Sequence, residues 1–187
     1  MPPKCKFKRE EIIAAALDIT REQGIGSVTA RAVGAKLDSS SKVIFSLFEN
    51  MEEVLKEVIK AANARYQAYL KEDMREGKYP PYKASGMAYI LFAKEERELF
   101  KLLFMRDRSG EVPGKNEEEI EPLLQMIREN TGLSRQEAYM FHLEMWICVH
   151  GIATMIATGY LEWDWELISR MLSDSYFGIL TSFQSQK

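Results

Sequence analysis

Three serines and a lysine stand together in AKLDSSSKVIFSLF, residues 35–48, and their side chains could bind a polyanion. Serine hydroxyls donate hydrogen bonds to phosphate oxygens or contact base edges, and a lysine adds positive charge where a nucleic acid would release counterions. A solvated helix cap and loop would also contain such residues. The elements around the serines must therefore decide between a binding surface and a plain cap.

A second candidate site lies in MFHLEMWICVHGIATMIATG, residues 140–159, where Trp146 and His150 are four residues apart on one helical face. His150 has two interpretations, a ligand contact or a histidine packed and hydrogen-bonded inside a helix bundle. His142 and His150 are eight residues apart and so roughly 80° apart around a helix. We therefore expect no metal site from this pair alone; a metal site would need Cys148 or a carboxylate from another helix as a further ligand. We also expect no cofactor.

The sequence contains no GxSxG, no P-loop, no GxGxxG after a strand and no HExxH. We therefore predict that the chain is not an enzyme. The alternative is a small helical enzyme, and its only candidate catalytic residues would be Glu144 with His142 or Cys148.

Composition describes an ordinary globular protein: 187 residues, 46% hydrophobic and 28% charged. No apolar run approaches the ~20 residues that span a bilayer, and the start has no signal-peptide core, so we expect a cytoplasmic protein with no membrane partner. The net charge of −3 is unevenly distributed, because residues 1–48 contain eight Lys/Arg against five Asp/Glu. A basic head on an acidic body could approach a polyanion head first.

Apolar residues recur at helical spacing along the whole chain, which predicts an all-α fold of about nine helices. Gly24 is a predicted C-terminal cap. Thr29 is the predicted N-cap of one short helix and Ser40 or Ser39 that of the next, and the two helices would form a helix-turn-helix. The predicted helices are 9–23, 30–36, 41–47, 50–76, 82–94, 95–105, 118–130, 134–158 and 164–183.

The stretch EEIIAAALDITREQGIGSVTARAVGAKLDSSSKVIFSLFENMEEVL resembles the head of the tetracycline-repressor (TetR) family of transcription regulators, from about Lys8 to Val58. The resemblance implies a helix-turn-helix DNA-binding domain at 6–66 and an effector-binding and dimerisation domain at 67–187. It also implies a ligand-responsive repressor that binds a palindromic double-stranded DNA operator as a homodimer. The residues that it places toward DNA are Lys8, Thr29, Arg31, Ser39, Ser40, Ser41, Lys42, Phe45 and Ser46.

The head departs from the family pattern at several positions. The family usually has Gly-Val where this chain has Asp38-Ser39, a tyrosine at the position of Phe45, and often a lysine at that of Met51. Asp tolerates a left-handed backbone less well than Gly, and phenylalanine lacks the phenolic hydrogen bond to phosphate. An alternative function is therefore a helical adaptor with degenerate DNA binding.

The body is rich in methionines and aromatic residues, which fill cores and also line cavities for apolar ligands. Its Trp-His-Gly spacing resembles the signature of one C-terminal class of the family. We predict a small-molecule effector site, for an apolar or aromatic compound, near Phe92, Phe104, Trp146 and His150. The last two predicted helices, 134–158 and 164–183, have larger apolar faces than one subunit needs, and the resemblance implies that they form the homodimer interface.

Overall fold

The computed structural model describes residues 7–107, 109 and 117–185. Over these residues the chain is all-α, as predicted, with eight α-helices where the sequence indicated about nine. The start of the predicted first domain, residue 6, lies outside the described residues. The helices are α1 (Arg9–Gln23), α2 (Ala30–Lys36), α3 (Met51–Glu76), α4 (Pro81–Glu95), α5 (Arg97–Phe104), α6 (Glu117–Thr131), α7 (Arg135–Ala157) and α8 (Trp165–Gln184).

The helices form two compact units. The first unit contains the chain up to Ala68 together with Glu95–Arg106, and the second contains Tyr69–Lys94 and the chain from Asp107 on. Helix α3 therefore contributes to both units. Helix α5 belongs to the first unit, although it is far along the chain from the other helices of that unit.

The first unit is built on α1, whose apolar residues recur at helical spacing. Ile12, Ala16 and Ile19 are buried, and they share a core with Val33 of α2 and with Val54 and Val58 of α3. Helix α1 ends as predicted at Gly24, whose N–H donates to the Thr20 carbonyl over 2.8 Å. The φ of Gly24 is +82° and its ψ is 162°, so the cap has a positive φ without the predicted left-handed helical ψ.

The predicted helix at 41–47 is wrong in type. Ser41–Val43 form a single turn of 3₁₀-helix, and residues 44–47 continue as turns. The hydrogen bonds are of the short i→i+3 kind: the N–H of Val43 donates to Ser40 and that of Ile44 to Ser41. Adjacent β-branched residues and serines that bond their own backbone disfavour a longer α-helix here.

Helix α5 packs against α1 inside the first unit. Leu99 and Phe100 are fully buried, and Phe104 packs edge-on against Tyr66 of α3, with 5.2 Å between ring centroids. The α5 helix thus completes the core of the unit that carries the serine stretch.

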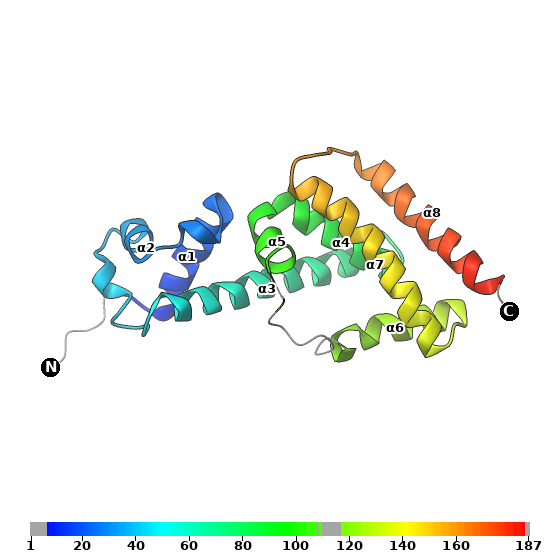
Figure 1. Cartoon of the computed structure of the whole chain (residues 1–187), viewed down its shortest axis with the longest axis horizontal. Helices are drawn as coiled ribbons and strands as arrows, with labels where there is room; N and C mark the ends of the chain where they lie inside the picture. The colour runs from blue at the N-terminus through cyan, green and yellow to red at the C-terminus, as the bar shows by residue number, and fades with distance from the viewer. Residues whose placement is uncertain (1–6, 108, 110–116, 186–187) are drawn as a thin grey trace. The chain divides into compact units, whose positions relative to one another are not determined.

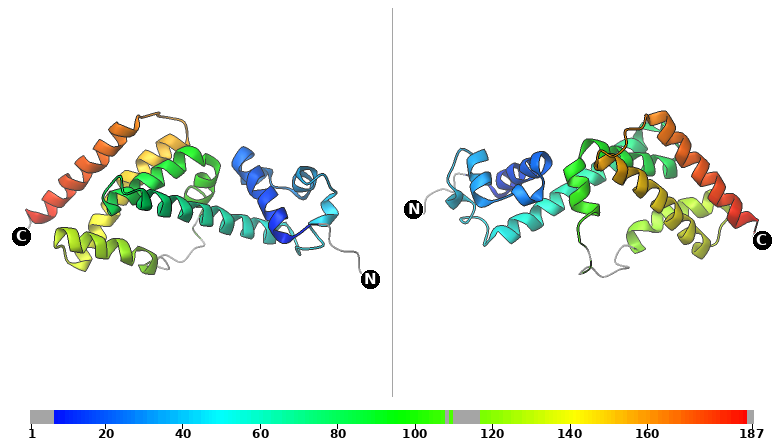
Figure 2. Two further views of the ribbon diagram at one scale, coloured as in Figure 1. Left: turned by 180° about the vertical axis from the view of Figure 1, so that it is seen from behind. Right: turned by 45° about the horizontal axis from the view of Figure 1, so that its top comes forward.

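In the second unit α7 packs against both α6 and α8, and α7 and α8 lie side by side (Figures 1 and 2). Phe141 of α7 is fully buried and contacts the ring of Tyr176 on α8, 5.1 Å between centroids. Ser134 caps α7 and Asp164 caps α8 through their side chains, which fixes where both helices begin.

Helix α7 is long and apolar enough to cross a membrane when judged by length and composition alone, and among the described helices only α7 meets that test. The core helix of a soluble protein passes the same test. Helix α7 packs Phe141, Val149 and Ile152 into the second unit.

Candidate nucleic-acid interface

The serine stretch is held against α2 by a close approach of the backbone. Thr29 caps α2 as predicted: its Oγ1 accepts the N–H of Ala32 over 3.1 Å. Just beyond the C-terminus of α2, the N–H of Ser39 donates to the carbonyl of Gly34 over 2.9 Å. The chain therefore turns back on α2 immediately after the helix ends.

Gly34 makes this approach possible because it has no Cβ. A Cβ at that position would lie 2.9 Å from the Ser41 nitrogen and 3.1 Å from the Ser39 oxygen. These are backbone atoms, so they have no flexible side chain that could move away. Sequence reasoning missed this glycine; its only local signal was a glycine in the middle of a seven-residue helix.

The turn after α2 passes through Asp38, whose φ is +48°. Among the described residues it is the only one other than glycine with a positive φ. Left-handed backbone costs an L-residue roughly 1–2 kcal/mol, less for Asp and Asn than for most others. Because Asp stands at this turn instead of Gly, the backbone at Asp38 is locally strained.

The segment from Ser41 to Phe48 has one buried and one exposed side. Ile44 and Phe48 are buried four residues apart, so they share a face that packs into the first unit. Lys42, Phe45 and Ser46 are all exposed. A cation, an aromatic ring and a hydroxyl thus project from one short segment.

The other predicted DNA-facing residues also lie in the first unit. Lys8, at the N-terminus of α1, is exposed, as are Thr29 and Arg31 at the start of α2. Ser40 is exposed, whereas Ser39 and Ser41 are half-buried in the turn that Gly34 contacts. The structure therefore leaves the exposed members open to a ligand and gives Ser39 and Ser41 a packing role as well.

Arg9 fixes the end of the segment and was missed by sequence reasoning. Its guanidinium lies 4.0 Å from the centroid of the Phe48 ring, donates to the Leu47 carbonyl and pairs with Glu53 over 2.6 Å. The hydrogen bonds lower the pKa of Glu53, first that from the Glu49 N–H and then that from Arg9. No local pattern indicates a contact between residues 44 positions apart.

A nearly buried carboxylate joins three helices of the first unit. Glu96, at the start of α5, is only 4% exposed, and it accepts hydrogen bonds from Arg21 of α1 and Arg65 of α3. The N–O distances are 2.7 Å to Arg21 and 2.6 Å to Arg65. Burial alone raises the pKa of Glu96, but the two arginines outweigh it and leave the pKa below its usual value. The carboxylate therefore stays ionised at neutral pH and ties α5 to α1 and α3.

The four predicted effector residues are in different surroundings. Phe92 is fully buried in the second unit and packs edge-on against Tyr69, whereas Phe104 is half-buried in the first unit. Trp146 is 43% exposed on α7, and its ring stacks on His150 with 5.0 Å between centroids. Trp146 and His150 are thus in direct contact, and Phe92 lies in the same unit as they do, whereas Phe104 lies in the first unit.

Each histidine of α7 is paired with a tyrosine of α4. The hydroxyl of Tyr89 lies 2.8 Å from Nδ1 of His150, and that of Tyr82 lies 3.0 Å from Nδ1 of His142. Burial lowers the pKa of both histidines, so both are neutral at pH 7. Of the residues considered for an enzyme, His142 contacts Tyr82, Cys148 contacts Ser175 and Glu144 is exposed.

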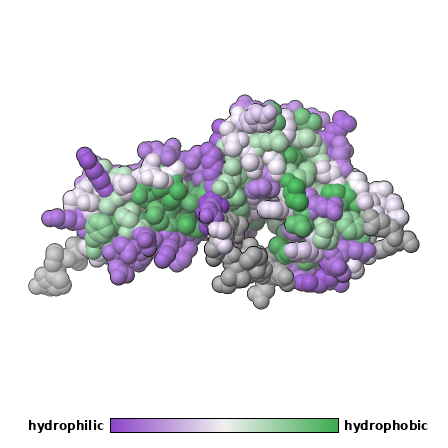
Figure 3. Space-filling model, viewed as in Figure 1, coloured by the Kyte–Doolittle hydropathy of each residue, from purple (hydrophilic) through white to green (hydrophobic). Residues whose placement is uncertain are grey.

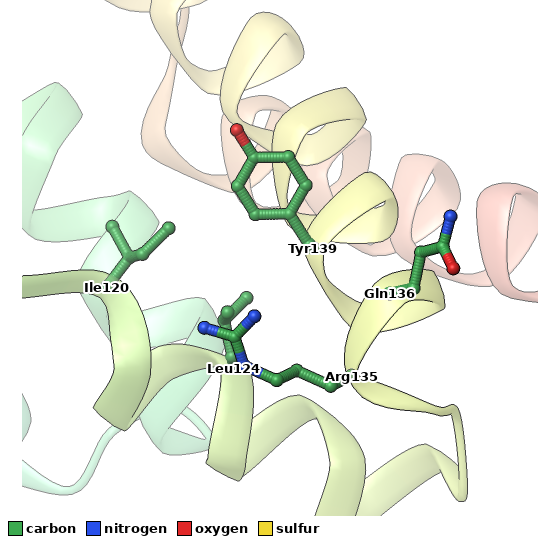
Figure 4. Close-up of a pocket in the computed structure, with 5 residues that line it drawn as sticks. All are labelled: Ile120, Leu124, Arg135, Gln136 and Tyr139. Carbon is green, nitrogen blue, oxygen red and sulfur yellow. The ribbon is translucent and has the colours of Figure 1, made fainter. Parts of the chain in front are cut away.

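A cavity of about 390 Å³ opens between α6 and α7 (Figure 4). Figure 4 shows the Arg135 side chain reaching across Leu124, with Tyr139 above it. Arg135 also pairs with Glu121 over 2.9 Å. The cavity is lined by apolar and polar side chains: Ile120, Leu124, Arg135, Gln136 and Tyr139.

Several large apolar side chains of α7 and α8 are exposed in the single chain. Ile147 is 60% exposed and Phe177 is 64% exposed, although both lie within long helices whose opposite faces are already packed. Hydrophobic side chains are visible on the face of the second unit that Figure 3 shows. Further exposed apolar side chains on the two helices are Tyr139, Met140, Leu143, Trp146, Met155 and Leu167.

Comparison with known proteins identifies the second part of the chain. Residues 82–174 match the family model of the tetracyclin repressor-like C-terminal domain. No curated protein matches the chain. The match runs from the start of α4 through α5, α6 and α7 to the middle of α8. The chain belongs to the tetracycline-repressor family of transcription regulators.

Proposed function

We propose that the protein is a ligand-responsive repressor that binds a palindromic DNA operator as a homodimer. The observation that carries the proposal is the exposed face of Lys42, Phe45 and Ser46, opposite the buried Ile44 and Phe48. A short segment packed on α2 in this way is the second element of a helix-turn-helix, which lies in the major groove. Lys42 then meets phosphates or base edges, and Arg31 at the start of α2 meets phosphate.

The homodimer forms through the exposed apolar faces of α7 and α8. Two-fold symmetry presents two such segments to two half-sites about 34 Å apart, or a multiple of that distance. The symmetry of the operator follows from the symmetry of the protein.

Lys42→Ala and Arg31→Ala are expected to weaken DNA binding on the order of tenfold each at moderate salt, because each removes two cations from the dimer. The slope of log affinity against log salt should become shallower by about 2 per variant. Fluorescence anisotropy with a labelled duplex, selected from a random library by the parent protein, measures both quantities. The helical circular dichroism signal and the mass in solution should not change.

Lys71→Ala is the matched control, since Lys71 is an exposed lysine of the second unit.

If the parent binds no duplex in a salt-dependent manner, the helical adaptor is the better description. If it binds DNA and both variants bind as tightly as the parent, the assignment of the groove-facing segment is wrong.

We also propose that the second unit binds a small apolar or aromatic effector. Trp146 stacked on His150 supplies an aromatic surface, and the cavity at α6–α7 has a volume within the range of ligand pockets, about 300–1,000 Å³. A ligand changes DNA affinity only by binding two conformations of the protein unequally. Phe92 and Phe104 stay proposed, with Trp146 and His150, as residues of the effector site.

Compounds that quench tryptophan fluorescence are expected to lower DNA affinity, and Trp146→Ala should remove that effect while leaving DNA affinity itself unchanged. Arg135→Ala tests the cavity in the same assay. A loss of response in Arg135→Ala alone would place the effector at α6–α7. A monomeric Trp146→Ala protein would assign Trp146 to the dimer interface.

A further inference from the structure

Phe45 has an unusual position among the aromatic residues of the first unit. Its side chain is 52% exposed, and no other aromatic side chain described in that unit is exposed. Phe48 lies under Arg9, and Phe100 and Phe104 pack against each other with 5.2 Å between centroids. The fold therefore does not use the Phe45 ring for its core.

The residues beside Phe45 on the exposed face are polar. Lys42 is three residues before it and exposed, and Ser46 directly follows it. The Ser46 hydroxyl donates to the Val43 carbonyl over 2.7 Å, so its proton is engaged inside the turn. Phe45 is thus a single apolar group on a face that otherwise offers a cation and a hydroxyl oxygen.

The chemistry of the ring limits what it can contact on DNA. A phenyl ring has no strong hydrogen-bond donor or acceptor, so it gains little beside a phosphate oxygen. The apolar group on the floor of the major groove is the C5-methyl of thymine, which phenylalanine can contact. A cation three residues away, on the same face, would hold the backbone of the duplex while the ring lies against the base.

We propose that Phe45 contacts the C5-methyl group of a thymine in each half-site and so determines the base preferred at that position. The inference rests on the proposed DNA-binding function and adds a sequence preference to it.

The test removes only the methyl group. A duplex is selected from a random library by the full-length parent protein, and each symmetric pair of thymines is replaced in turn by deoxyuridine. At one pair the parent should lose about fourfold in affinity per methyl group, about 15-fold for the two half-sites together. At the other thymine pairs the parent should bind the thymine duplex and the deoxyuridine duplex with the same affinity.

Protein variants then connect the methyl group to the ring. Phe45→Ala should bind the thymine and deoxyuridine duplexes equally, whereas Lys42→Ala should bind both more weakly and keep the 15-fold preference. Phe45→Tyr retains a ring and should keep the preference. The ring is exposed, so Phe45→Ala should melt at the parent's temperature, which thermal circular dichroism checks.

The outcomes separate this inference from the function on which it rests. If the parent binds the selected duplex with steep salt dependence but no thymine pair is sensitive to uracil, the inference is overturned and the DNA-binding function stands. The inference is also overturned, and the DNA-binding function stands, if Phe45→Ala keeps the parent's preference for thymine. If the parent selects no duplex and binds none in a salt-dependent manner, both are overturned.

Discussion

Gly34→Ala is expected to destabilise the first unit by about 3 kcal/mol and to weaken DNA binding with it. The added Cβ would lie 2.9–3.1 Å from backbone atoms of Ser39, Ser40 and Ser41. Either α2 or the serine turn must move, and the turn presents Lys42 and Phe45. Urea unfolding followed by circular dichroism measures the loss of stability, and anisotropy with the selected duplex measures the loss of affinity.

Gly26→Ala is the matched control in the same unit, because a Cβ at Gly26 meets no atom within 4 Å. Its stability should equal that of the parent or exceed it slightly, since alanine restricts the unfolded chain more than glycine does. A Gly34→Ala protein with the parent's urea midpoint and affinity would show that the turn does not depend on this close approach.

The extent of most helices could be predicted from the sequence because the signals are local. The observed α1 spans the predicted residues 9–23, and α3 begins within one residue of the predicted start at 50. Thr29 was identified as a cap because a hydroxyl before an apolar helix accepts an N–H two or three residues later. Such signals need only a few neighbouring residues, so a single sequence contains them.

Features that depend on residues distant in sequence could not be predicted in this way. Glu96 contacts Arg21 and Arg65, which are 75 and 31 positions away, and its own neighbours are ordinary charged residues. The same is true of α5, which joins the first unit through packing against α1. Helical periodicity shows that a face is apolar but does not name the helix that covers it.

The serine stretch has one feature that could be predicted from the sequence and one that could not. The family resemblance placed Lys42, Phe45 and Ser46 toward DNA and Ile44 and Phe48 in the core. In the structure the first three are exposed and the last two are buried. The conformation of the stretch was not predicted, since a 3₁₀ turn and an α-helical turn give nearly the same pattern over so few residues. The DNA-facing role of these residues stays a prediction, as does the Trp-His-Gly class suggested by Trp146.

If the proposed homodimer forms through α7 and α8, Ile147→Asp and Phe177→Asp are each expected to convert it into a monomer and to lower operator affinity by a factor on the order of a hundred or more. Both side chains are apolar and more than half exposed in the single chain. An aspartate in a desolvated dimer interface would be buried without a partner, which costs several kcal/mol. A monomer must bind each half-site separately and loses the high effective concentration that the second head has in a dimer.

Sedimentation at micromolar concentration measures the mass of each variant, and anisotropy with full and half operators measures binding. Tyr160→Asp is the control, because Tyr160 is 76% exposed in the segment between α7 and α8 and should leave the dimer intact. A half-site duplex should bind the monomeric variants as tightly as it binds the parent, since their heads are unchanged. A dimeric mass for both aspartate variants would place the interface away from Ile147 and Phe177. A monomer with the parent's affinity for the full operator would contradict two-fold recognition itself.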